Sequence, residues 1–346
     1  MPPSRQPEPP DHVVPLADIL KARERIAGRL HRTPLLTSAT AAAWLTAATG
    51  ARLGGDRLFL KAEHLQKTGS FKPRGMTNRI ATLTEDERSR GVITLSAGNA
   101  GQAYAWAGRS AGVSVTVVMP AGAVRSKVDA CLGYGAQVVL HGAHVGETFA
   151  EMERIRDADG LRFVHPFDDP AVIAGHGSIG LELLEDEPEL DVAVVGVGGG
   201  GLISGVAAAL KGRRPGIRVF GVEPVRSNAL SLALAQNEVV RIQPESVADG
   251  LNAPFAGAWT LAMARRYLDD VILLDEPTIL AGMRFAMERM KQVLEPAGAA
   301  ALGAVLAGLV PIRDGERIAV VLSGGNVEVG RIGELLAGAG TLPGAP

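Results

Sequence analysis

Short runs of apolar, β-branched residues alternate with helical patterns along most of this 346-residue chain. Several runs are apolar throughout, which is typical of strands buried on both faces of a parallel sheet. Strands that alternate with helices form right-handed βαβ crossovers. We therefore predict an α/β fold with parallel sheets flanked by helices. The predicted strands cover residues 58–61, 92–95, 115–119, 137–140, 161–164, 192–197, 218–222, 271–274 and 318–322.

The predicted helices lie before and between these strands. They cover residues 16–30, 100–111, 145–157, 170–184, 202–211 and 277–294. The compact βαβ series after residue 91 predicts a small domain, on the substrate side, over residues 91–165. Residues 15–90 and 166–346 then join as a large domain, and the Pro-rich start predicts a mobile tail over residues 1–14. The expected place for an active site is the cleft at the carboxyl ends of the strands.

Charge and composition exclude several classes of protein. The chain has 35 Lys and Arg against 37 Asp and Glu, and this near-neutral balance argues against nucleic-acid binding. The longest uncharged apolar stretch, residues 192–210, is rich in glycine and starts with β-branched residues, so it predicts a buried strand, loop and helix rather than a membrane span. With Cys131 as the one cysteine, no intramolecular disulfide is possible. We expect a cytoplasmic protein that binds neither nucleic acid nor membranes.

One predicted strand runs directly into four consecutive glycines, Gly198 to Gly201, and then into a helix. Backbone N–H groups at a helix N-terminus bind phosphate, and glycines let the ligand approach because they carry no Cβ. The same residues satisfy G-x-G-x-x-G, and Glu223 ends the next strand, near the place of the ribose-binding acid in a dinucleotide fold. An oxidoreductase that uses NAD(P) is therefore an alternative.

Lys72 lies in a loop rich in Gly, Ser and Pro, residues 67–75, which follows a strand and opens a helix with Pro73 at its first position. The neighbouring Arg74 and the helix N-terminus both disfavour a charge on this lysine. A lysine with a lowered pKa acts as a nucleophile and base, including in Schiff-base chemistry. A solvated surface lysine is the alternative interpretation, and the surrounding residue types make it the weaker one.

Two further polar loops follow predicted strands. Residues 95–101 read Leu-Ser-Ala-Gly-Asn-Ala-Gly and enter a helix, where N–H groups could bind a carboxylate. Residues 322–326 read Leu-Ser-Gly-Gly-Asn after an apolar strand. Each loop alone is an ordinary turn signal, but together with the glycine loop and the lysine loop they could converge on one cleft.

These motifs, in this order, resemble the threonine/serine dehydratase (threonine ammonia-lyase) branch of the fold-type II pyridoxal-phosphate enzymes, from about residue 16 to 332. The resemblance implies a two-domain fold similar to the β subunit of tryptophan synthase. It also implies pyridoxal 5′-phosphate as cofactor, a small amino acid as substrate and a homodimer. The motifs that carry it are His31-Arg-Thr-Pro-Leu-Leu, Lys61-Ala-Glu-His-Leu-Gln-Lys-Thr-Gly-Ser-Phe-Lys-Pro-Arg-Gly, His165-Pro-Phe-Asp-Asp-Pro, the glycine loop, Leu294-Glu-Pro and Ser323-Gly-Gly-Asn.

Carried over residue by residue, the resemblance implies a role for each matched position. Lys72 would be catalytic, first as the Schiff-base lysine and then as the base that removes the Cα proton. The cofactor would be bound by Phe71, Lys72, Asn99, Gly198, Gly199, Gly200, Gly201, Leu202, Glu295 and Ser323. The substrate would be bound by Ser96, Ala97, Gly98, Asn99, Ala100 and Gly101. The implied reaction is β-elimination from a β-hydroxy-L-amino acid, such as threonine or serine, to a 2-oxo acid and ammonia.

The chain departs from the family pattern at three positions. Ala97 stands where related serine racemases have a serine hydroxyl, so dehydration is favoured over racemisation. Ala100 replaces the usual histidine, which makes a bulkier substrate of the phenylserine type an alternative. Ala229 replaces an acidic residue of the divalent-metal subgroup, so we expect no required metal and regard Glu223 equally as a strand-end carboxylate. Little sequence follows the last motif, so we expect no C-terminal regulatory domain and no control by isoleucine.

Overall fold

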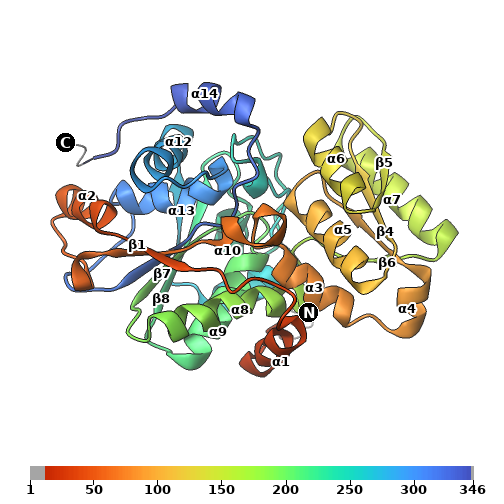
Figure 1. The fold of residues 1–346 in the computed structure, drawn as a ribbon, viewed down its shortest axis with the longest axis horizontal. Coiled ribbons are helices and arrows are strands. Elements are labelled where there is room, and N and C mark those ends of the chain that lie inside the picture. The colour runs from red at the N-terminus through yellow and green to blue at the C-terminus, as the bar shows by residue number, and fades with distance from the viewer. Residues whose placement is uncertain (1–11, 344–346) are drawn as a thin grey trace, which may run out of the picture.

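The chain is built on two β-sheets. The computed structural model describes residues 12–343, so most of the predicted mobile tail, residues 1–14, lies outside the described residues. A six-stranded and a four-stranded sheet form the centres of two lobes, which Figure 1 shows side by side. The predicted two-domain α/β fold is confirmed. We call the lobe around the six-stranded sheet the large domain and the other lobe the small domain.

The sheet of the large domain has the strand order β1-β2-β10-β7-β8-β9. Neighbouring strands from β2 to β9 run parallel, whereas β1 pairs antiparallel with β2. Strand β1 was not predicted, because its four residues lie at the sheet edge and none is fully buried, so no apolar run marks them. The strands cover Leu35–Ser38 (β1), Leu58–Lys61 (β2), Val192–Gly196 (β7), Arg218–Pro224 (β8), Asp270–Leu274 (β9) and Ile318–Val321 (β10).

The sheet of the small domain is parallel throughout, in the order β5-β4-β3-β6. All four strands lie inside the predicted small domain, whose limits of 91–165 stay a prediction, as do the limits of the large domain. The strands cover Val92–Leu95 (β3), Val115–Met119 (β4), Gln137–Leu140 (β5) and Arg162–Phe163 (β6). The helices of this lobe are Asn99–Ala111 (α5), Arg125–Gly133 (α6) and Val145–Asp159 (α7).

Two predicted helices end earlier than expected. The helix predicted over 16–30 ends at Ile26, and Gly28 then takes a φ of 72°. The helix predicted over 277–294 changes to a π-helical turn after Phe285 and stops at Lys291, which has a φ of 60°. The remaining helices are Leu16–Ile26 (α1), Ala39–Thr49 (α2), Pro73–Ala81 (α3), Glu85–Arg90 (α4), Pro170–Asp186 (α8), Gly201–Arg213 (α9), Ala229–Gln236 (α10), Ala258–Tyr267 (α11), Glu276–Phe285 (α12), Pro296–Leu306 (α13) and Val329–Ala337 (α14).

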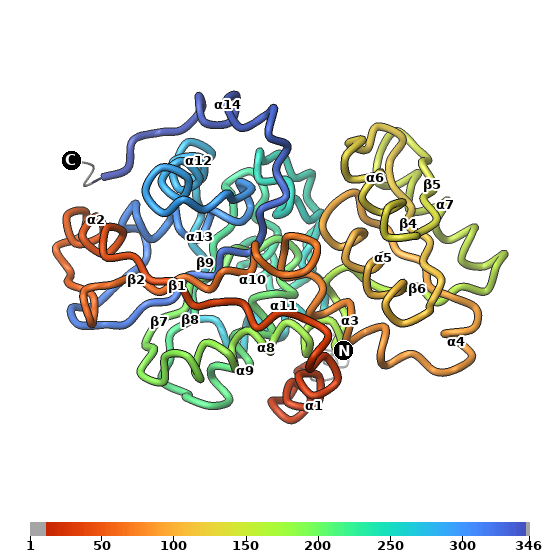
Figure 2. Tube along the Cα trace, in the orientation of Figure 1, coloured from red at the N-terminus to blue at the C-terminus, as the bar shows by residue number. Residues whose placement is uncertain are grey.

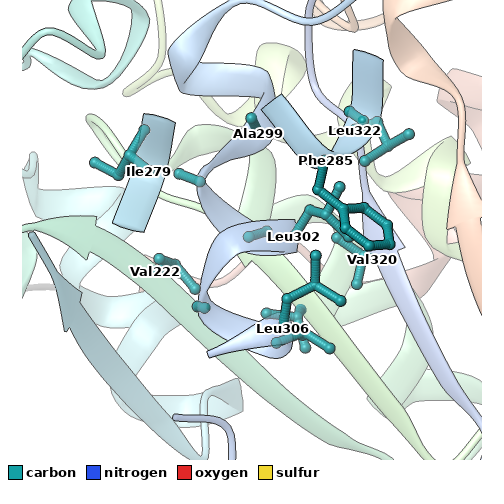
Figure 3. Close-up of a cluster of buried hydrophobic side chains, with 14 of the residues drawn as sticks. Val222, Ile279, Phe285, Ala299, Leu302, Leu306, Val320 and Leu322 are labelled. Carbon is teal, nitrogen blue, oxygen red and sulfur yellow. The ribbon is translucent and has the colours of Figure 1, made fainter. Parts of the chain in front are cut away.

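The large sheet is buried on both faces. Successive residues of a strand point to opposite faces, and in β7 Val192 and Val194 join one hydrophobic cluster while Ala193 and Val195 join another. The first cluster surrounds α13, every residue of which is buried, and Figure 3 shows its side chains packed against the sheet. Helices α8 and α9 pack against each other on the opposite side. No helix within residues 12–343 is long and apolar enough to cross a bilayer.

A buried cluster of four charged side chains lies beneath the start of α3. Arg74 is 2% exposed and binds both carboxylate oxygens of Glu63, each at 2.8 Å. It also binds both oxygens of Glu182, at 2.7 and 2.9 Å, and Lys61 Nζ lies 2.6 Å from Glu182 Oε2. The two cations and two carboxylates neutralise one another, which offsets the cost of burying charge. The cluster joins β2, α3 and α8 next to Lys72.

Replacement of Arg74 by Met tests how much this cluster contributes to the stability of the fold. Two buried carboxylates would then share the single cation of Lys61, so we expect the free energy of unfolding to fall by about 3–5 kcal/mol, as for other broken buried ion pairs. Urea denaturation at pH 7 measures the change. The matched control is Arg154→Met, which breaks an exposed ion pair with Glu151 on α7 and should leave the midpoint in place. A wild-type midpoint for Arg74→Met would contradict the prediction.

Candidate active site

Lys72 lies at the start of α3, next to the segment that leads out of the small domain. It is the N-cap of that helix, with Pro73 at the first helical position as predicted. Its Nζ donates a 3.1 Å hydrogen bond to the backbone oxygen of Pro166 and lies 5.0 Å from the centre of the Phe71 ring. Figure 1 shows α3 where the two lobes meet.

Burial lowers the pKa of Lys72 to about 8, and the negative charge of Glu295 partly opposes this shift. The direction agrees with the sequence prediction, but the cause differs. The positive charge of Arg74 was expected to lower this pKa, yet Arg74 is neutralised by its own two carboxylates. Withdrawal of the amine from water is the main cause, because burial disfavours the charged form of any lysine.

Glu295 is a second residue of the site whose pKa is shifted. It is the N-cap of α13 and is 3% exposed. Burial raises the pKa of its carboxyl group to about 8, and the negative charge of Asp249 acts in the same direction. Around pH 7 this carboxyl group is therefore mostly protonated, and it holds a proton within electrostatic reach of Lys72.

Side-chain amides connect Glu295 to both domains. Asn99, the first residue of α5, donates a 2.7 Å hydrogen bond from Nδ2 to Oε1 of Glu295. Asn326 in turn donates from its Nδ2 to Oδ1 of Asn99 at 2.8 Å and to the backbone oxygen of Thr68 at 2.7 Å. Asn326 was not among the predicted site residues, although it ends the quoted Ser-Gly-Gly-Asn motif.

The loop after β10 lies directly against the lysine loop. Phe71 donates its N–H to the backbone oxygen of Ser323 at 3.1 Å, and Ser70 forms an isolated antiparallel bridge with Gly324. Ser323 is 5% exposed, and its Oγ donates a long, 3.4 Å hydrogen bond to the backbone oxygen of Ala297. The lysine loop, the asparagine loop and the Ser323 loop are thus brought together around Glu295.

The glycine loop joins this site through Phe167. Gly200 is the N-cap of α9 with a φ of 86°, a conformation that favours glycine. A Cβ on Gly199 would collide with the ring of Phe167, and one on Gly201 would lie 2.6 Å from the oxygen of Phe167. Phe167 follows Pro166, whose carbonyl binds Lys72. Packing therefore accounts for the glycines, and the same packing places the loop next to the lysine.

The N-terminus of α9 is suited to an anion. Among the described residues, no side chain caps this thirteen-residue helix. Its first N–H groups and the positive end of its dipole are therefore left for a ligand. Leu202, the second residue of the helix, is 6% exposed and packs in the core of the large domain. The predicted strand, glycine loop and helix are confirmed here.

Ser96 organises the asparagine loop. Its Oγ accepts hydrogen bonds from the N–H groups of Gly98, at 3.3 Å, and Gly101, at 3.1 Å. Those two N–H groups are consequently bound inside the loop. Ala97 is partly exposed, whereas Ala100 is 5% exposed and packs in the hydrophobic cluster of the small domain. The substrate-binding assignment of residues 96–101 stays a prediction.

His165 shapes the segment that Lys72 touches. Its Nδ1 accepts hydrogen bonds from the N–H groups of Phe167, at 3.2 Å, and Asp168, at 2.8 Å. Burial lowers the pKa of His165 to about 4, and the positive charge of Lys72 acts in the same direction. This histidine is therefore neutral near the amine. The role of the Pro166 carbonyl was not predicted, although the quoted motif that starts at His165 marks this segment.

Glu223 does not support the nicotinamide alternative. Its Oε1 accepts a hydrogen bond from the N–H of Leu230 at 2.8 Å. Its Oε2 accepts hydrogen bonds from the N–H and from the hydroxyl of Ser231, at 2.9 and 2.6 Å. Burial raises the pKa of this carboxyl group to about 6. The carboxylate thus caps α10, and its oxygens are engaged with protein donors. Within residues 12–343, no cluster of His, Cys, Asp and Glu has the arrangement of a metal site.

Comparison with known proteins agrees with this geometry. L-threonine ammonia-lyase of Thermotoga maritima is 40% identical over 325 residues, which cover 94% of this chain and 78% of that protein. A solved threonine deaminase from T.th. is 37% identical, with a TM-score of 0.81 over 91% of this chain and 99% of that one. Maize serine racemase is 34% identical, with a TM-score of 0.85 over 94% and 97%.

The match to a family described as pyridoxal-phosphate dependent enzyme extends over residues 26–324. This range includes the lysine, asparagine and glycine loops, Glu295 and Ser323. The family match and the relatives leave the nicotinamide oxidoreductase without support. The chain belongs to the pyridoxal-phosphate dependent enzyme family.

Proposed function

We propose that this chain is an ammonia-lyase that dehydrates and deaminates a β-hydroxy-L-amino acid, such as threonine or serine, to a 2-oxo acid and ammonia. The observation that carries the proposal is Lys72, a partly buried amine with a pKa near 8 where loops of both domains meet. The relatives named as threonine ammonia-lyase and threonine deaminase support the substrate class.

Pyridoxal phosphate fits the residues around Lys72. The uncapped N-terminus of α9 suits its phosphate group, and the weakly bonded, neutral hydroxyl of Ser323 suits a ring nitrogen that need not stay protonated. When bound, the cofactor supplies an electron sink for negative charge at the substrate Cα. The residues that would hold it are Phe71, Lys72, Asn99, Gly198 to Gly201, Leu202, Glu295 and Ser323.

Lys72 would have two tasks. Its amine holds the cofactor, and once released it takes the proton from Cα of the substrate as a general base. Burial favours the neutral amine that both tasks require. The neighbouring His165 stays neutral at neutral pH, because burial lowers its pKa to about 4. Lys72 and Glu295, whose pKa values both lie near 8, are therefore the groups in this part of the site that change their proton occupancy near pH 8.

The asparagine loop would bind the substrate carboxylate. The N–H groups of Gly98 and Gly101 bond to Ser96 Oγ, which thus acts as an acceptor twice. Its own hydrogen has no acceptor among the described residues and is free to be donated to a carboxylate oxygen. Asn99 sits between this loop and Glu295, so it would bind the cofactor's ring oxygen from the small-domain side.

The phenylserine-type alternative depends on Ala100. This side chain packs inside the hydrophobic cluster of the small domain and is 5% exposed, so it gives no specific reason to prefer a bulkier substrate. Threonine and serine therefore remain the proposed substrates.

We further propose a homodimer, the commonest closed assembly, and a cytoplasmic location, which a lone buried Cys131 permits.

Replacement of Lys72 by Ala tests the central assignment. We expect the visible absorption band of the bound cofactor, fixed by borohydride in the wild type, to disappear. We also expect 2-oxo acid formation from threonine, serine and phenylserine to fall by at least about 100-fold, since general-base catalysis alone contributes that much. Lys21→Ala, an exposed lysine on α1, is the control. A wild-type protein that forms no such band with added pyridoxal phosphate would overturn the proposed function.

The pH dependence of cofactor uptake tests the lowered pKa. The neutral amine is the nucleophile, so the rate at which cofactor-free protein takes up pyridoxal phosphate should rise with pH, with a midpoint near 8. Stopped-flow absorbance between pH 6 and 10.5 measures it. In Glu295→Gln the midpoint should fall slightly, because the negative charge that Glu295 carries in part near pH 8, and that raises the pKa of Lys72, is gone. A wild-type midpoint above 10, the value of an exposed lysine, would show that the amine is not desolvated.

Replacement of Ala97 by Ser tests the choice between elimination and racemisation. The family resemblance implies a serine hydroxyl at this position in racemases, so Ala97→Ser should raise racemisation of serine relative to elimination by about tenfold, a low threshold for a new acid–base group. Chiral chromatography of the remaining serine, with parallel assay of 2-oxo acid, gives the ratio. Ala97→Val controls for size without a hydroxyl. An unchanged ratio in Ala97→Ser would show that position 97 does not face Cα.

A further inference from the structure

Two neighbouring residues of α6 reach from the small domain to the large one. Lys127 Nζ forms an ion pair with Asp249, the first residue of a short 3-10 helix, Asp249–Leu251 (η4). Ser126 Oγ donates a 2.6 Å hydrogen bond to Oε1 of Glu328, the N-cap of α14. Figure 2 shows α6 on the side of the small lobe that faces α14. We call these two interactions the α6 contact.

On the large-domain side, the α6 contact ends beside the active site. A Cβ on Gly250, the residue after Asp249, would lie 2.9 Å from Ala297 Cβ and 3.8 Å from Glu295 Oε1. A Cβ on Gly198 would lie 3.1 Å from Leu251 Cα. The segment that carries Asp249 therefore packs between the glycine loop and the buried carboxyl group of Glu295.

On the small-domain side, the α6 contact is connected to the asparagine loop. Helix α6 packs against α5, the helix that begins at Asn99. A Cβ on Gly101 of α5 would lie 3.5 Å from Sγ of the buried Cys131 of α6. Side chains packed at this density transmit a shift of one helix to the next. Interactions that fix the position of the first turn of α6 therefore also restrain the position of Asn99.

The lysine end of this ion pair is partly shielded from water, whereas the aspartate end is exposed. The Lys127 side chain is only 17% exposed, and that of Asp249 is 47% exposed. An isolated surface pair contributes little to stability, but here the pair acts together with the Ser126–Glu328 bond on the same turn. Both interactions lie outside the residues assigned to the cofactor and the substrate.

We propose that Lys127 and Asp249 are positioning residues for the reaction of Lys72, because their ion pair holds the small domain closed and keeps Asn99 against Glu295. The inference rests on the proposed function, whose substrate would be enclosed by this closure. A closed site excludes water and strengthens the polar interactions inside it. When the closed state is populated only in part, the apparent affinity for substrate falls by that fraction.

Charge reversal and charge exchange test the proposal on the holoenzyme. Lys127→Asp and Asp249→Lys should each raise KM for threonine by about tenfold or more, with kcat changed much less, because loss of the closed state weakens apparent binding. The double variant K127D/D249K restores an ion pair with reversed polarity and should return KM to within about threefold of wild type. Lys127→Arg should behave as wild type, and Lys127→Met serves if Lys127→Asp does not fold.

The control is an ion pair inside one domain. Lys211 lies 2.7 Å from Asp269 in the large domain, so Lys211→Asp has the same charge change and should leave KM unaltered. Amide hydrogen exchange gives a readout that does not depend on turnover. Exchange at the start of α5 should be faster in Lys127→Asp and should return to the wild-type rate in K127D/D249K, with Lys211→Asp unchanged.

Three results would overturn the proposal. Single variants with wild-type KM would show that the ion pair does not control closure. A folded double variant without rescue would show that Lys127 acts on the substrate directly. Unchanged exchange at α5 would separate the α6 contact from Asn99. A wild-type enzyme that consumes none of the tested amino acids would contradict only the proposed function, because the exchange measurement still reports on closure.

Discussion

The structure depends most on the balanced cluster of Lys61, Glu63, Arg74 and Glu182. Charges removed from water are tolerated only when each has an opposite partner with good geometry, and Arg74 binds two carboxylates through four hydrogen bonds of 2.7–2.9 Å. The cluster fixes the first turn of α3 relative to β2 and α8. Because Lys72 is the N-cap of that helix, the cluster also fixes where the catalytic candidate leaves the backbone.

Exclusion of water is the common cause of the electrostatics in the site. It lowers the pKa of Lys72 and His165 and raises the pKa of Glu295. All three shifts favour the neutral forms, so the site is prepared for proton transfer without a large buried charge. This state needs loops from both domains, since Asn99 comes from the small domain and its partner Glu295 from the large one.

Sequence patterns were most accurate where apolar or β-branched residues follow one another directly. The strands at 58–61, 92–95, 115–119 and 137–140 were predicted with the observed bounds, because a continuous run of apolar or β-branched residues marks a strand in a parallel sheet. The antiparallel β1 was missed, since its four residues, Leu-Leu-Thr-Ser, include only two apolar ones. The end of the helix at Lys291 was also missed, because a left-handed turn at a lysine leaves no trace in hydrophobic periodicity.

The sequence by itself determined the α/β architecture, the lysine at the start of a helix and the glycine loop that opens another. These features depend on local properties, namely side-chain period, a proline at the first helical position and the absence of a Cβ. Only the tertiary structure decided that Asn99 binds Glu295, 196 positions away, and that Lys127 pairs with Asp249, 122 positions away. Such pairs, and the burial that shifts the pKa of Lys72, arise from packing of distant segments and leave no local pattern.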